Sequence, residues 1–171
     1  MADRPFIVLF LCTGNSARSI LAEALLNYHG AGRFRAFSAG SFPRGAVHPE
    51  ALALLDRLDL PAAELRSKSW DEFAAPGAPQ IDFIFTVCDN AAGETCPIWL
   101  GHPITAHWGI PDPAAVEGPA QRRAFAKAFR SLQYRISRLL SAPLDGMDRA
   151  TLQFWLRDIG AIGNESARVD A

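Results

Sequence analysis

A thiol and a guanidinium enclose a short polar segment near the start of the chain. In the stretch "LFLCTGNSARSIL", Cys12 and Arg18 lie six positions apart with small residues between them. An apolar run at 6–11 precedes them and predicts a buried strand, and a helical pattern of apolar residues begins at Ser19. Free backbone N–H groups and the helix dipole make such a strand-to-helix turn a site for anions. Gly14 lets the backbone approach a ligand closely.

The chemistry predicted for this loop is attack by a thiolate on a bound tetrahedral oxyanion. Arg18 can direct two N–H groups at one oxyanion. A helix N-terminus and a nearby arginine also lower the pKa of a thiol, so Cys12 is expected to ionise readily. The alternative is an inert buried cysteine beside an exposed arginine. Neither a Walker phosphate loop nor a dinucleotide-binding turn is predicted, because neither glycine pattern occurs here.

Two further reactive side chains follow predicted strands. Cys88 comes directly after an apolar run at 81–87, and Asp112 follows a weaker run at 104–108 by a few residues. Because the carboxyl ends of parallel strands share one edge of a sheet, we expect Cys12, Cys88 and Asp112 to gather there. The prolines on both sides of Asp112 stiffen its backbone, and a rigid carboxyl near an anion can act as a general acid. An ordinary turn aspartate is the alternative, and the expected place of Cys12 on the same edge favours catalysis.

The other two cysteines, Cys88 and Cys96, enclose the segment "DNAAGET". A second thiol beside an activated thiol indicates exchange, in which a mixed disulfide forms and a third thiol resolves it. Two unrelated thiols are one alternative. A metal site made with His102 and His107 is another, but the spacing matches no common zinc pattern, and no metal is predicted.

Alternating strands and helices must position these groups. The length of 171 residues fits one domain with a sizeable core. Apolar runs typical of strands alternate with segments of helical period, which predicts an α/β fold with a mainly parallel sheet. The expected strands are 6–11, 34–38, 81–87 and 104–108, and the expected helices are 19–28, 49–58, 119–140 and 148–159.

The composition argues against several classes of function. The chain has 17 basic and 18 acidic residues, so its charge gives no reason to expect nucleic acid or a membrane surface as a partner. No apolar stretch approaches the ~20 residues of a membrane span, and a cytoplasmic location is expected. Three cysteines, an odd number, do not indicate a framework of structural disulfides.

Four segments carry a family resemblance: "LCTGNSARS", "FSAGSFPRGAVHPEA", "DFIFTVCDNAAGETCP" and "ITAHWGIPDPA". Together they resemble arsenate reductases of the low-molecular-weight protein tyrosine phosphatase superfamily, over roughly 6–140. The resemblance implies a flavodoxin-like, three-layer α/β sandwich in which helices flank a four-stranded parallel sheet. We therefore expect a phosphatase-like domain at 1–142. Residues 143–171 are expected to form a C-terminal extension with a short helix, not a separate domain.

The resemblance also implies a relay of three thiols that reduces arsenate to arsenite for arsenic detoxification. Cys12 attacks arsenate, Asp112 protonates the leaving hydroxide, and Cys88 then attacks Cys12 and releases arsenite. Cys96 next attacks Cys88, and an external thiol partner reduces the Cys88–Cys96 disulfide. The oxyanion is bound by Arg18 and the rest of its loop, namely Thr13, Gly14, Asn15, Ser16, Ala17 and Ser19.

No bound cofactor is expected, because thiols supply both electrons. Thioredoxin is the usual reductant that the resemblance implies. Glutaredoxin with glutathione stays open, because seven residues separate Cys88 from Cys96 here and the better-known relatives carry six. Phosphate and sulfate are expected to compete with arsenate, since all three anions are tetrahedral.

Some members of the resembled family bind a potassium ion beside the loop. The matching residues here are Asn15, Glu23 and Ser38, and the segment that would add an acidic ligand reads "RSKSWDEF". The ammonium of Lys68 can replace the cation, so no metal is predicted.

Two other functions fit part of the pattern. A phosphatase that hydrolyses phosphomonoesters, including phosphotyrosine, through a Cys12 phosphocysteine needs only Cys12, Arg18 and Asp112. A non-enzymatic redox or metal-binding module is the other candidate. The Cys88–Cys96 pair favours the reductase, because a phosphatase does not need it.

Overall fold

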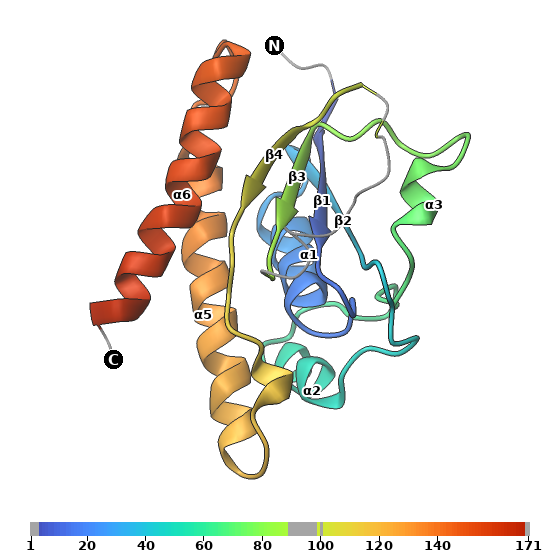
Figure 1. The fold of residues 1–171 in the computed structure, drawn as a ribbon, viewed down its shortest axis with the longest axis vertical. Coiled ribbons are helices and arrows are strands. Elements are labelled where there is room, and N and C mark those ends of the chain that lie inside the picture. Colours follow the sequence, from blue (N-terminus) through green and yellow to red (C-terminus); the bar gives the residue numbers. More distant parts are fainter. Residues whose placement is uncertain (1–3, 89–98, 100, 170–171) are drawn as a thin grey trace.

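A four-stranded parallel sheet forms the centre of the protein in this computed structural model, which describes residues 4–88, 99 and 101–169, with side chains up to residue 161 (Figure 1). All neighbouring strands are parallel, in the order β2-β1-β3-β4, so their carboxyl ends lie at one edge. The strands are β1 (Phe6–Leu11), β2 (Phe34–Ala39), β3 (Phe83–Thr86) and β4 (Ile104–His107).

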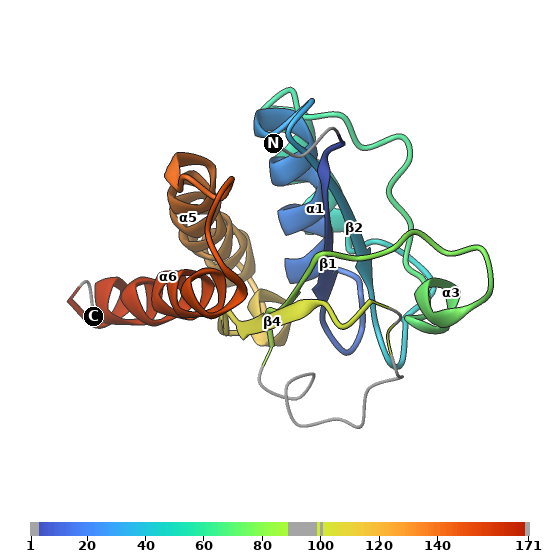
Figure 2. The same ribbon diagram turned by 90° about the horizontal axis from the view of Figure 1, so that it is seen from above.

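Helices lie on both sides of this sheet (Figure 2). The helices α1 (Arg18–His29), α5 (Ala120–Ser141) and α6 (Arg149–Val169) lie on one side, and the single-turn α3 (Asp71–Ala74) lies on the other. The helix α2 (Pro49–Arg57) packs against α1 and α5, and the 3-10 turn η1 (Pro113–Ala115) follows β4. None of the helices in the described part of the chain is long and apolar enough to cross a membrane.

The central strand β1 is buried on both faces, which explains its continuous apolar sequence. Successive side chains of a strand point to opposite faces. Val8 and Phe10 therefore join the large core, whereas Leu9 and Leu11 join a smaller cluster with Ile84. Both layers hold β1 rigidly, and its last residue stands directly before the polar loop.

The fold class predicted from the sequence is confirmed; two elements differ clearly in extent, and one helix was not predicted. The strand β3 covers Phe83–Thr86 rather than 81–87, because its pairing with β4 spans only those residues. The last helix continues to Val169 instead of ending near 159, where its apolar pattern stops and the residues from Gly160 on become small and polar. The helix α3 was not predicted, because it buries no residue and so leaves no periodic pattern.

Candidate active site

The loop between β1 and α1 brings Cys12 to the carboxyl edge of the sheet. The N–H of Cys12 donates to the carbonyl of the last residue of β2 at 3.2 Å, which continues the pairing of the two strands. The carbonyl groups of Thr13, Gly14 and Ser16 accept backbone hydrogen bonds from the connection between β2 and α2. These bonds orient the peptide groups of the loop before any anion arrives.

The end of β2 passes unusually close to this loop at Gly40. A Cβ atom there would lie 2.3 Å from the carbonyl oxygen of Thr13 and 2.6 Å from that of Cys12. Only glycine fits this approach. The sequence analysis did not single out Gly40, whose only signal is a glycine at the end of a predicted strand.

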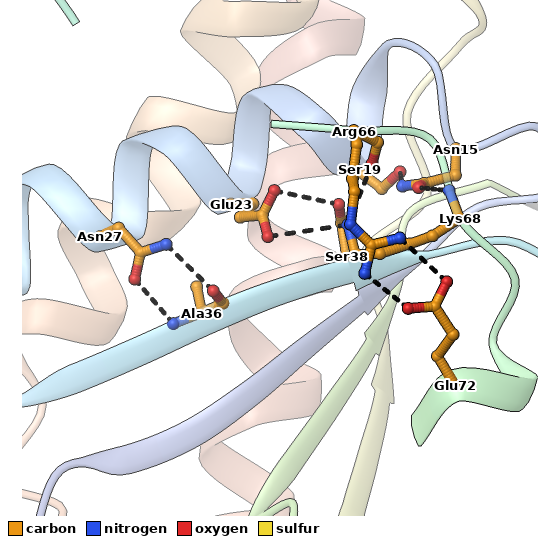
Figure 3. Close-up of polar contacts among 9 residues, drawn as sticks. All are labelled: Asn15, Ser19, Glu23, Asn27, Ala36, Ser38, Arg66, Lys68 and Glu72. Carbon is orange, nitrogen blue, oxygen red and sulfur yellow. Dashed lines mark hydrogen bonds and ion pairs between the residues drawn. The ribbon is translucent and has the colours of Figure 1, made fainter. Parts of the chain in front are cut away.

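Asn15 fixes the turn from the loop into α1 (Figure 3). Its φ angle is 43°, in the left-handed region that asparagine tolerates better than most residues. The side chain is fully buried and bonded at both ends: Nδ2 donates to Ser19 Oγ at 2.8 Å, and Oδ1 accepts from the N–H of Lys68 at 2.9 Å. The conformation of the loop is therefore held by side-chain contacts as well as by the backbone.

A buried ion pair lies directly behind Asn15 (Figure 3). The ammonium of Lys68 lies 3.9 Å from Glu23 Oε1, and Ser38 Oγ donates to Glu23 Oε2 at 3.2 Å. Lys68 Nζ also donates to the carbonyl of Arg66 at 3.0 Å. Burial raises the pKa of Glu23, and the charge of Lys68 opposes that rise. The ammonium of Lys68 thus lies beside Glu23, which also accepts from Ser38, and the sequence analysis named all three residues.

The thiols of Cys12 and Cys88 meet in the loop. Both residues are buried and free of disulfides. The N–H of Thr13 donates to Cys88 Sγ at 3.3 Å, and Thr13 Oγ1 lies 3.6 Å from the same sulfur. Two thiols predicted from distant parts of the sequence are thus brought together at the start of the loop.

The expectation that Cys12 ionises readily is contradicted in this arrangement. The neighbouring Cys88 thiol, to which neutral Cys12 can donate a hydrogen bond, and burial raise the pKa of Cys12, because both favour the protonated form. The charge of Arg18 and the backbone of Gly14 lower it by less. The sequence analysis weighed only the groups that stabilise a thiolate, and it had no measure of burial.

Arg18 and Asp112 stand side by side at the same edge. Arg18 Nη1 donates to the carbonyl of Ile110 at 2.8 Å, and Nη2 lies 3.7 Å from Asp112 Oδ1. Among the described residues, buried Nε of Arg18 has no acceptor, which leaves a donor for an oxyanion. Asp112 Oδ1 also accepts from the N–H of Ala114 at 3.0 Å, so η1 holds the carboxyl group in place.

The remaining predicted residues are placed as follows. Ser16, Ala17 and Ser19 are buried in the loop and the first turn of α1. Cys96 lies outside the described residues. His107 bonds through Nδ1 to Thr86 Oγ1 at 2.7 Å. Where the structure describes the chain, no three His, Cys, Asp or Glu side chains are grouped to hold a metal.

The chain belongs to the low molecular weight phosphotyrosine protein phosphatase family, whose model matches residues 7–150. This is the class of protein that the parallel sheet and the loop of thiol and arginine define. Within it, the chain is similar to arsenate reductases. The arsenate reductase of Shouchella clausii is 32% identical over 117 residues, which are 68% of this chain and 81% of the relative.

Solved structures agree with this placement. The arsenate reductase of Archaeoglobus fulgidus is 29% identical, with a TM-score of 0.57 over 76% of this chain and 98% of that chain. A thioredoxin-dependent arsenate reductase of Corynebacterium glutamicum is 24% identical and has the same fold, with a TM-score of 0.62 over 82% of this chain. This chain spans 62% of the length of the Corynebacterium protein.

Proposed function

We propose that this protein reduces arsenate to arsenite. Cys12 passes its thiol proton to an oxygen of the bound arsenate and attacks the arsenic atom, Arg18 and the loop N–H groups hold the oxyanion, and Asp112 protonates the leaving hydroxide to water. Cys88 then attacks Cys12 Sγ, and the electron pair of the sulfur–arsenic bond moves to arsenic. Arsenite leaves, and a Cys12–Cys88 disulfide remains. Two thiols lose two electrons and arsenic gains two, so the reaction needs no bound redox cofactor.

The relay then needs a third thiol and an external reductant. Cys96 attacks Cys88, which frees Cys12 and leaves a Cys88–Cys96 disulfide. An external dithiol reduces that disulfide. We propose thioredoxin for this step, because one protein of the same fold is described as thioredoxin-dependent. Glutaredoxin with glutathione is the other thiol system to test.

The observation that carries the proposal is the place of Cys88, whose Sγ accepts a hydrogen bond from the N–H of Thr13, the residue after Cys12, at 3.3 Å. A resolving thiol must reach the sulfur that carries the arsenic, and here the Cys88 thiol lies beside Cys12 at the start of the loop. The relatives named arsenate reductases support the same reaction. Hydrolysis of a phosphoester gives no reason for a second buried thiol at this place.

Hydrolysis of phosphomonoesters through a phosphocysteine is the second candidate. The pair of Arg18 and Asp112 favours it, because one can hold a phosphoryl group while the other protonates the leaving oxygen. This candidate predicts activity that does not depend on Cys88.

Arsenate-dependent oxidation of NADPH separates the two candidates. The protein is mixed with arsenate, thioredoxin and thioredoxin reductase, and in parallel with glutaredoxin, glutathione and glutathione reductase. We expect turnover in one of the mixtures, and its loss in Cys12→Ser, Cys88→Ser and Cys96→Ser. The control Ser141→Ala changes an exposed serine at the end of α5 and should keep the full rate.

The Cys88→Ser variant provides the sharpest result. It should form at most one equivalent of the Cys12 adduct and release no arsenite in repeated turnover. Arsenite formation at the wild-type rate in this variant contradicts the relay. Rapid hydrolysis of an aryl phosphate without arsenate-dependent oxidation in either mixture assigns the loop to a phosphatase.

A further inference from the structure

The last helix of the chain reaches the segment that carries Asp112. The family model matches residues 7–150, and α6 begins at Arg149, so nearly all of α6 lies outside the part shared with the family. Nevertheless α6 packs on β4 and α5, beside the sheet (Figures 1 and 2). Three contacts connect it to the end of β4.

The first contact is a close approach at Gly160. A Cβ atom at this position would lie 2.4 Å from the carbonyl oxygen of His107 and 2.8 Å from Trp108 Cδ1. Glycine is unfavourable inside a helix, because it has more conformational freedom to lose than alanine. The close approach to the strand end gives a physical reason for a glycine here.

The second contact is a hydrogen bond from a buried indole. Trp108 Nε1 donates to the carbonyl of Leu156 in α6 at 2.8 Å, and the ring is fully buried. The backbone N–H of Trp108 donates to Thr86 in β3 at 2.7 Å. Trp108 is therefore held between α6 and the sheet.

The third contact comes from Arg135 of α5, which is 1% exposed. Its Nη2 lies within hydrogen-bond distance of two carbonyl oxygens, those of Gly109 at 3.3 Å and Gly160 at 3.5 Å. Nη1 donates to Ser131 Oγ at 2.5 Å, which fixes the guanidinium on α5. One buried cation thus joins α5, α6 and the segment after β4.

The segment held in this way leads directly into the active site. The carbonyl of Ile110 accepts a hydrogen bond from Arg18 Nη1 at 2.8 Å. The N–H of Ile110 donates to the carbonyl of Val87, the residue before Cys88, at 3.0 Å. Asp112 follows two positions later. A displacement of residues 109–110 would therefore move the carboxyl of Asp112 and the support of Arg18 together.

We propose that α6 positions the 109–112 segment for the acid step, through Gly160 and Arg135. These two are positioning residues, since they act through the segment and are placed away from the reacting atoms. The inference rests on the proposed role of Asp112 as the acid. It makes α6 part of the machinery of this chain rather than an appendage to the family domain.

The variant Gly160→Ala tests this inference, with Ala161→Ser on the exposed neighbouring residue as the control. The added methyl group must push His107 and Trp108 aside, and a small misplacement of a catalytic group costs up to ~100-fold in rate. We expect kcat for arsenate reduction to fall ~10-fold or more and KM to change less than ~3-fold. Trp108→Phe keeps a ring but loses the N–H, and should give a smaller loss of the same kind.

A double-mutant cycle distinguishes positioning from general damage. If Gly160→Ala acts through Asp112, its loss in kcat should nearly vanish in an Asp112→Asn background. The fall in kcat towards high pH, which reports loss of the proton from a general acid, should also weaken in Gly160→Ala. Losses that simply multiply in the double variant, with an unchanged pH profile, overturn the inference.

Hydrogen exchange gives a readout that does not depend on the substrate. In Gly160→Ala the amides of Trp108 and Ile110 should exchange faster than in the wild type, while that of Leu9 in β1 stays protected. Unchanged exchange at Trp108 and Ile110 in a folded variant overturns the inference. If the wild type reduces no arsenate, that result refutes the proposed function but not the positioning role of α6. The same cycle is then run with phenyl phosphate, whose poor leaving group needs the acid.

Discussion

Replacing Lys68 by methionine removes one charge of the buried pair behind the anion loop. The side chains of Lys68 and Glu23 are 6% and 9% exposed, and their charged atoms lie 3.9 Å apart. Removing one partner of a buried ion pair costs ~3–5 kcal/mol, because the other charge stays buried without compensation. We expect the lower end, ~3 kcal/mol, since Ser38 still donates to Glu23 at 3.2 Å. With an m-value of ~2 kcal/mol/M in urea, the unfolding midpoint falls by ~1.5 M.

The loss should depend on pH with a defined sign. Burial raises the pKa of Glu23, and removing Lys68 raises that pKa further because the opposing charge is gone. A carboxyl whose pKa is raised by folding contributes stability below its unfolded pKa, ~4.3, and this contribution is lost as pH rises through its folded pKa. The difference in unfolding free energy between the wild type and Lys68→Met should therefore be small near pH 4.5 and grow towards pH 8.

Urea unfolding followed by circular dichroism at several pH values measures this difference. The double variant Glu23→Gln/Lys68→Met removes both charges and should recover most of the lost stability. Arg4→Met is the matched control, because the exposed pair of Arg4 and Asp82 is screened by solvent and contributes at most ~1 kcal/mol. A midpoint that does not move in Lys68→Met, or a loss of equal size at pH 4.5 and pH 8, would refute the reasoning.

Three further predictions concern the loop itself. Gly40→Ala places a methyl group against the carbonyl of Thr13 and should weaken phosphate binding ~10-fold or more. Binding is measured by the protection that phosphate gives Cys12 against iodoacetamide. Equal protection in both proteins would show that the loop tolerates the methyl group. Asn15→Ala loses two buried hydrogen bonds and should lower the free energy of unfolding by ~1–3 kcal/mol in urea, and an unmoved midpoint contradicts this. Arg18→Lys loses the planar guanidinium that can donate two hydrogen bonds to one oxyanion, and it should raise KM for arsenate ~10-fold or more in steady-state kinetics. An unchanged KM argues against a contact between Arg18 and the oxyanion.

Much of the scaffold was predictable because its signals are local. The apolar run before Cys12 and the period of the helix after it depend only on neighbouring residues, and both elements were found nearly in full. The shared edge of parallel strands then predicted that Cys88 and Asp112 would approach Cys12 and Arg18. Boundaries were less accurate at β3, where the pairing with β4 decides the extent, and at α6, whose apolar pattern stops before the helix ends.

The sequence by itself determined the α/β class, the polar loop with its thiol and guanidinium, and the strand edge where reactive side chains gather. Only the tertiary structure decided that Cys88 lies beside Cys12 and raises its pKa, and that α6 reaches the segment of Asp112. The physical reason is the range of the interactions. Periodicity and turn chemistry act over a few residues, whereas burial, hydrogen bonds between distant segments and the approach of two backbones exist only when the chain has packed.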